Sequence, residues 1–66
     1  MEFQPTNAAG PFGTATEYRI ARGPTVAYLG KRADGRWWLE FGGREQRLGR
    51  KASFPSAQKA LIGMGW

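Results

Sequence analysis

Apolar and polar residues alternate in four short segments along the middle of the chain, a pattern typical of antiparallel strands that bury one face. Two glycine-containing pairs, Asp34-Gly35 and Gly42-Gly43, separate the last three segments. Both pairs supply the positive φ angles that two-residue hairpin turns need. The predicted strands are residues 18–22, 25–32, 36–41 and 44–48.

Two-residue turns determine which residues lie opposite one another, and this register determines which side chains share a face. Lys31 is then expected opposite Trp38, and Trp38 opposite Arg47. The predicted core face contains Val26, Tyr28, Trp37, Leu39, Phe41 and Leu48. The predicted exposed face contains Ala27, Leu29, Lys31, Trp38, Glu40, Glu45 and Arg47.

A short helix is predicted after the last strand. Ser53 or Ser56 can cap it, Pro55 suits its first turn and Gly63 can end it. Its apolar stripe consists of Phe54, Ala57, Ala60 and Leu61. A helix of about two turns is marginal alone, so we expect this stripe to pack on the core face of the sheet. Trp66, in the short tail that follows, is expected to fold back onto the body.

Residues 1–16 mix Pro, Gly, Ala, Thr and Asn and show neither a helical nor a strand period. They are interpreted as a flexible N-terminal arm, which Phe3 and Phe12 could anchor to the body or to a partner. Residues 17–66 are expected to form a single small domain. The predicted fold class is α+β, a three- to four-stranded antiparallel β-meander packed against one short C-terminal α-helix.

Composition excludes several function classes. The chain has 66 residues and contains neither cysteine nor histidine, which excludes disulfides, Cys/His metal sites and imidazole catalysis. The carboxylates form no obvious acid–base pair, and the glycines lack the spacing of a phosphate-binding loop. We therefore expect a protein that is not an enzyme and needs no cofactor.

The charge of the chain favours a polyanionic partner. Ten basic residues oppose five acidic ones, for a net charge of +5, and all ten basic residues lie after residue 16. Such a density attracts nucleic acid at long range, although it also keeps a small domain soluble. The candidate nucleic-acid-binding residues are Lys31, Arg32, Arg36, Trp38, Arg44, Arg47, Arg50 and Lys51.

Trp38 is expected on the exposed face between Lys31 and Arg47. A sheet with such a face can enter the DNA major groove, where arginine reads guanine and lysine holds phosphate. The indole could instead stack on an unpaired base, or simply pack between its two cationic neighbours.

Glu40 and Glu45 are predicted to lie opposite each other on the same exposed face, where they would repel each other and phosphate. A glutamate can accept a hydrogen bond from cytosine N4, or form salt bridges with Lys31, Arg47 and a partner's arginine. The second possibility supports an alternative role as a regulator or inhibitor that binds a protein through Trp38 or a sheet edge.

Several segments resemble the AP2 and phage-integrase amino-terminal DNA-binding domains. The similar features are Gly35-Arg36-Trp37-Trp38 at a strand start, Leu48-Gly49 after the last strand, and a helix that begins near Phe54 and is rich in alanine. The resemblance implies that Arg36, Trp38, Glu40 and Arg47 lie on the sheet face that enters the major groove. By analogy, a small basic protein of this kind is also typical of phages and plasmids.

The chain shows no secretory signal and no apolar stretch long enough to span a bilayer, so we expect a cytoplasmic protein without a membrane partner. DNA is the favoured partner, with RNA or an acidic protein as alternatives. The small core also suggests a homodimer, formed by edge pairing of the strand at residues 18–22.

Overall fold

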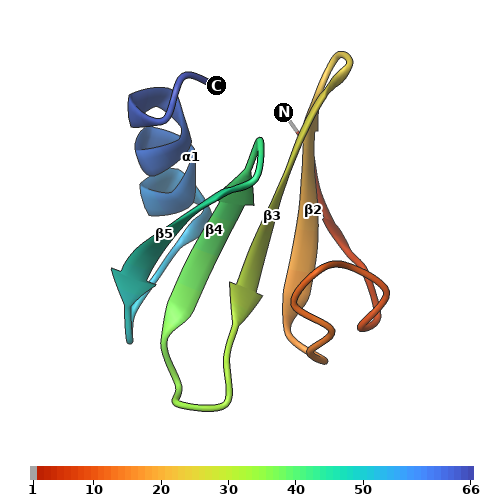
Figure 1. Cartoon of the computed structure of the whole chain (residues 1–66), viewed down its shortest axis with the longest axis vertical. Coiled ribbons are helices and arrows are strands. Elements are labelled where there is room, and N and C mark those ends of the chain that lie inside the picture. The colour runs from red at the N-terminus through yellow and green to blue at the C-terminus, as the bar shows by residue number, and fades with distance from the viewer. Residues whose placement is uncertain (1) are drawn as a thin grey trace.

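Five antiparallel strands follow one another across a single sheet, in the order β1-β2-β3-β4-β5, and one helix lies against it (Figure 1). The computed structural model describes residues 2–66. The elements are β1 (Glu2–Pro5), β2 (Glu17–Arg22), β3 (Thr25–Lys31), β4 (Trp37–Phe41), β5 (Arg44–Gly49) and α1 (Phe54–Gly63). The predicted α+β class is confirmed, but the sheet has five strands rather than three or four.

The N-terminal segment provides the additional strand. β1 pairs with β2 along its whole length, with Phe3 opposite Ile20. The Phe3 ring also stacks on Phe54, with 4.3 Å between the ring centroids. The prediction that residues 1–16 contain no strand is therefore wrong, because apolar contacts with the body stabilise a strand whose own pattern is weak. β2 now has a neighbour on each side, so the dimer edge predicted at residues 18–22 is not free.

The turn between β4 and β5 has the predicted geometry. Gly42 and Gly43 both adopt positive φ angles, of 60° and 79°, as a two-residue hairpin turn requires. Phe41 consequently lies opposite Arg44. Further from the turn the register shifts by one residue, so that Trp37 lies opposite Gly49 rather than the predicted Leu48.

The turn between β3 and β4 differs from the prediction. The Gly35 N–H donates to the Arg32 carbonyl at 2.9 Å, and the Arg32 N–H donates to the Arg36 carbonyl at 2.9 Å. Gly35 has a φ of 83°. These bonds define a three-residue loop, a type I turn followed by a left-handed glycine, in place of the predicted two-residue turn.

The longer loop moves the register of β3 by one residue and exchanges its two faces. Leu29 lies opposite Leu39, and both are buried. Ala27 and Leu29 therefore belong to the core, whereas Val26 and Tyr28 are half-buried on the other face. The prediction for this strand is wrong, while the assignments of Trp37, Leu39, Phe41 and Leu48 to the core are confirmed.

The helix begins as predicted at a serine cap. The Ser53 hydroxyl accepts from the Ser56 N–H at 3.2 Å, and the Ser56 hydroxyl accepts from the Ser53 N–H at 2.9 Å. This reciprocal capping box satisfies two donors of the first turn. The helix packs on the core face through Ala57 and Leu61, which are fully buried.

Trp66 closes the core from the end of the chain. It is 9% exposed, and its ring centroid lies 5.7 Å from that of Phe41 in an edge-to-face arrangement. The prediction that this tryptophan folds back onto the body is confirmed. Within residues 2–66, no helix has the length and apolar character needed to cross a membrane.

Candidate functional site

The outer face of the sheet, opposite α1, carries the side chains of Trp38, Glu40, Glu45 and Arg47. Trp38 lies opposite Arg47 and Glu40 lies opposite Glu45, as the sequence predicts. The tight turn at Gly42 and Gly43 produces this arrangement because it fixes the register of β4 against β5.

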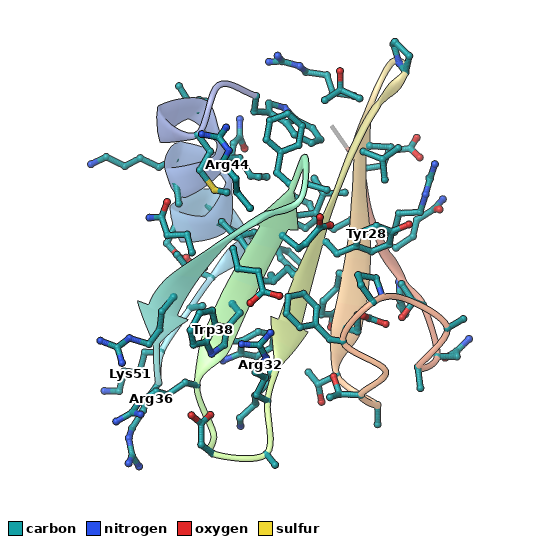
Figure 2. All side chains as sticks on the ribbon, viewed as in Figure 1. Tyr28, Arg32, Arg36, Trp38, Arg44 and Lys51 are labelled. Atoms are coloured by element: carbon teal, nitrogen blue, oxygen red, sulfur yellow. The ribbon has the colours of Figure 1, made fainter. Side chains whose placement is uncertain are left out.

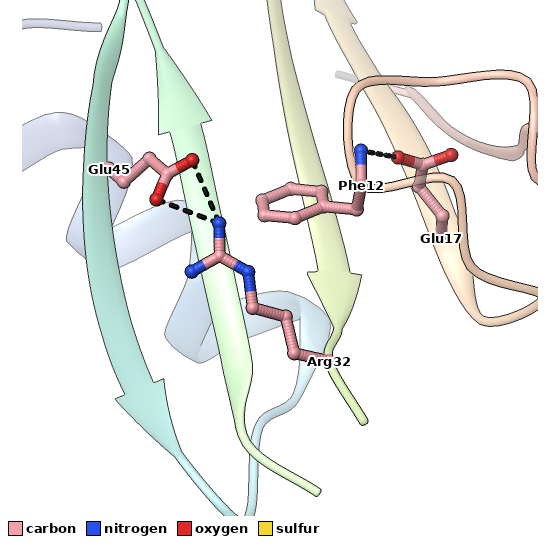
Figure 3. Close-up of polar contacts among 4 residues, drawn as sticks. All are labelled: Phe12, Glu17, Arg32 and Glu45. Carbon is pink, nitrogen blue, oxygen red and sulfur yellow. Dashed lines mark hydrogen bonds and ion pairs between the residues drawn. The ribbon is translucent and has the colours of Figure 1, made fainter. Parts of the chain in front are cut away.

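Arg32 directly follows β3 and extends its side chain over the outer face, beside Trp38 (Figure 2). Its guanidinium carbon lies 4.4 Å from the Trp38 ring centroid and 5.2 Å from the Phe12 ring centroid. The same group donates to both carboxylate oxygens of Glu45, at 2.8 and 2.9 Å (Figure 3). Arg32 is thus held by two aromatic rings and one carboxylate of its own chain, and it covers one face of the Trp38 indole.

The two opposed glutamates avoid mutual repulsion through separate partners. Glu45 pairs with Arg32, and the Glu40 carboxylate accepts from the Gly43 N–H at 3.1 Å. The salt bridges with Lys31 and Arg47, one of the two possibilities that the sequence left open, are absent among the residues that the structure describes. Glu45 is therefore paired with Arg32 within the chain, although both side chains stay more than a third exposed, at 42% and 37%.

Arg44, a predicted site residue, lies on the helix side of the sheet. It donates to the Met64 carbonyl, and Arg22 donates to the Trp66 carbonyl while lying 5.6 Å from the indole centroid. Both arginines therefore hold the C-terminal turn against the body. Lys31 also lies on the helix side of the sheet, since it pairs with Trp37.

The remaining predicted cations gather at one end of the sheet, beside Trp38. Arg36 precedes Trp37, which lies opposite Gly49, and Arg50 and Lys51 follow Gly49 directly. Figure 2 shows Arg36 and Lys51 at this same end. We call Arg36, Arg47, Arg50 and Lys51 the cationic end.

Acidic side chains of the chain neutralise little of the positive charge of the cationic end. Arg36 lies 3.7 Å from the Asp34 carboxylate, and both side chains are more than 40% exposed. Arg47, Arg50 and Lys51 are exposed and form no ion pair with any of residues 2–66. Four cations lie here beside two exposed acids, Asp34 and Glu45, and Glu45 is already paired with Arg32, so the surface is positive.

The loop between β1 and β2 covers the neighbouring part of the outer face. Phe12 lies directly over Gly30 of β3, where an added Cβ would come 2.5 Å from the ring. The Glu17 carboxylate holds this loop by accepting from the Thr6 hydroxyl and from the N–H groups of Gly10 and Phe12, both at 2.8 Å. The loop therefore covers the outer face beside Gly30, whereas the β4–β5 part of this face stays open to a large partner.

Phe12 anchors the loop to the body, one of the two possibilities that the sequence left open, whereas the structural role of Glu17 was not predicted. Phe12 lies in a segment without a period, and Glu17 resembles any solvated residue at the start of a strand. The glycines at positions 10 and 30 are the one signal available, because each marks a close approach by another group.

The acidic side chains of residues 2–66 are not clustered as metal ligands. The buried carboxylate of Glu17 has its oxygens occupied by loop donors. The chemistry that the cationic end offers is the binding of anions by exposed guanidinium and ammonium groups.

Comparisons of the chain with protein-family models, with curated proteins and with solved structures give no match. The resemblance to the AP2 and integrase domains therefore rests on the sequence features alone.

Proposed function

We propose that this protein is a non-enzymatic nucleic-acid-binding module that contacts the phosphate backbone through its cationic end. The observation that carries the proposal is the group of cations Arg36, Arg47, Arg50 and Lys51, of which only Arg36 has an ion-pair partner within the chain. Guanidinium and ammonium groups of this kind bind phosphate oxygens and release counterions from the nucleic acid.

Duplex DNA is the favoured ligand because of the shape of the open surface. β4 and β5 form the margin of the five-stranded sheet that the β1–β2 loop leaves open, and the major groove admits a strip of sheet about two strands wide. Arg47 lies on the outer face and can reach base edges, whereas Arg50 and Lys51 follow the end of β5 and can contact phosphates. Trp38 supports this surface rather than stacking on a base, since Arg32 covers one face of its ring.

Salt dependence tests the proposal directly. About four phosphate contacts predict that affinity for a random-sequence duplex falls roughly 100-fold between about 50 and 200 mM salt. Fluorescence anisotropy over a salt series gives this slope. The double variant R50A/K51A should lose about half of the slope, because two of the four contacts are removed.

The control variant R19A/K59A loses the same net charge from two exposed positions outside the cationic end. It should keep the wild-type slope. Equal slopes for the two double variants would show that the cationic end is not the binding surface. A wild-type affinity that does not change with salt would exclude the proposal altogether.

One observation favours a second candidate, the binding of an acidic protein by the same cationic end. The loop over β3 reduces the area of the sheet that could enter a DNA groove. The carboxylates of an acidic protein can pair with the same guanidinium groups. A stoichiometric partner that the tagged protein recovers from nuclease-treated lysate, and that R50A/K51A fails to recover, would support this candidate.

A further inference from the structure

β5 forms one edge of the sheet, and no strand of the described residues pairs with its outer side. The turn pair Phe41 and Arg44 begins the ladder with β4, and bonded pairs then alternate along the two strands. Arg44 and Gln46 therefore direct their backbone groups to β4. Glu45 and Arg47 direct theirs away from the sheet, toward any strand that approaches the edge.

The exposed backbone groups of β5 belong to two residues of opposite charge. Glu45 and Arg47 also place their side chains on the same outer face, two positions apart. Gln46 lies between them, with its side chain exposed on the other face. The edge thus has the order acid, neutral residue, base.

We propose that β5 pairs antiparallel with the β5 strand of a second copy of this chain, about a two-fold axis at Gln46. In this register Glu45 lies opposite Arg47 of the second copy, and Arg47 lies opposite its Glu45. Both are hydrogen-bonded pairs, so the edges exchange four backbone hydrogen bonds, and each Arg47 approaches the Glu45 carboxylate that Arg32 of the other copy already contacts. The two sheets become one continuous ten-stranded sheet.

Charge complementarity selects this register and this partner. An axis at Glu45 would oppose two carboxylates, and an axis at Arg47 would oppose two guanidinium groups, both of which are unfavourable. Only the axis at Gln46 pairs every outward residue with an opposite charge. An interface that matches its own copy in this way is self-complementary, as two-fold symmetry requires.

The opposite edge of the sheet is less suited to pairing. β1 has four residues, and its last residue, Pro5, has no N–H to donate. The inferred dimer therefore uses β5, in place of the strand at residues 18–22 that the sequence favours.

A single cysteine tests the two-fold axis. In the proposed register the two Gln46 residues form a non-hydrogen-bonded pair with Cα atoms about 4.5 Å apart, within the range that a disulfide spans. The chain has no cysteine of its own, so Q46C would supply the only thiol. In a glutathione buffer, Q46C should form a disulfide-linked dimer about tenfold faster than the control Q58C, which places a thiol on the exposed side of α1.

Charge substitutions test the proposed ion pairs. A mixture of two such variants then distinguishes the loss of an ion pair from a loss of folding. In the Q46C background, R47E opposes two acids across the axis, and E45K opposes two bases. Each should lower cross-linking to the Q58C rate. A mixture of the two should cross-link at the original rate and give the mixed dimer, because each edge then meets its complement.

Cross-linking of Q46C no faster than Q58C, in a protein whose circular dichroism is unchanged, would overturn the proposal. Homodimers of R47E or E45K that form at the original rate would also overturn it. These experiments contain no nucleic acid, and the dimer does not depend on the proposed function. The variant R50A/K51A, which impairs nucleic-acid binding, should leave Q46C cross-linking unchanged.

Discussion

Glu17 shows how far the surroundings of one residue can depart from what its type suggests. It is an acidic residue at the start of a strand, yet it is 1% exposed. The loop between β1 and β2 folds around its carboxylate and donates three hydrogen bonds to it. At Gly10 an added Cβ would come 2.6 Å from the carboxylate, so a residue without a side chain is needed there.

This environment makes the stability of the protein depend on pH. Burial raises the pKa of the Glu17 carboxyl, but hydrogen bonds from the Thr6 hydroxyl and from the N–H groups of Phe12, Gly10 and Gly13 together lower it below 4.5. Since the folded pKa lies below the unfolded one, the stabilisation is complete above about pH 4.5 and is lost as pH falls toward the folded pKa.

The variant E17Q should therefore be less stable at neutral pH and less sensitive to acid. The amide has one acceptor oxygen for three donors, so at pH 7 we expect a loss of about 1–3 kcal/mol of unfolding free energy. Urea denaturation between pH 3 and 7 measures both effects. E2Q, which changes an exposed acid, is the control. If E17Q were as much less stable than the wild type at pH 3 as at pH 7, the pH dependence of stability would not arise from Glu17.

At the scale of elements, the two hairpin turns show which strand registers could be predicted from the sequence and which could not. Gly42 and Gly43 adopt the left-handed angles of a two-residue turn, so the register of β4 against β5 near the turn was predicted correctly. A single left-handed glycine, Gly35, suits either a two-residue or a three-residue loop. The choice between them depends on burying Leu29 rather than Tyr28, which is a tertiary effect.

The one-residue difference in the register of β3 against β4 also made part of the predicted site wrong. The prediction placed Lys31 beside Trp38, and the structure places Arg32 there instead. The choice of Arg50 and Lys51 as candidate site residues did not depend on the strand register, because it rested on their charge alone. The loop over β3 could not be predicted, because its contacts join residues without any periodic pattern.

Contact between this loop and β3 can be tested at Gly30. In G30A the new methyl group would overlap the Phe12 ring, so the ring must leave the sheet. We expect a loss of about 1–3 kcal/mol of stability and faster hydrogen exchange of the Phe12 amide, which donates to Glu17.

The double variant F12A/G30A tests whether steric overlap with the Phe12 ring accounts for the loss of stability in G30A. Once the ring is absent, the methyl group meets no obstacle, so the double variant should be no less stable than F12A alone. The two substitutions are then strongly non-additive. Additive losses would mean that Gly30 is needed for a reason other than the approach of Phe12.

At the scale of the molecule, the two faces of the sheet differ in whether the rest of the chain covers them. The helix and Trp66 cover the core face, and Arg22 and Arg44 hold the C-terminal turn in place. These two arginines support the fold, so they contribute to the net charge of +5 without being free to bind a partner. Net charge alone therefore overestimates the number of cations available to nucleic acid.

Because the core is small, its closure by Trp66 should determine whether the chain folds. A domain of this length has a stability of roughly 3–10 kcal/mol, and truncation of a buried tryptophan to alanine costs about 3–5 kcal/mol. W66A should therefore be largely or partly unfolded at 37 °C, with a lower melting temperature by circular dichroism. I62A removes an apolar side chain that is 61% exposed and should change the stability by less than about 0.5 kcal/mol. Equal melting temperatures for the two variants would show that Trp66 does not close the core.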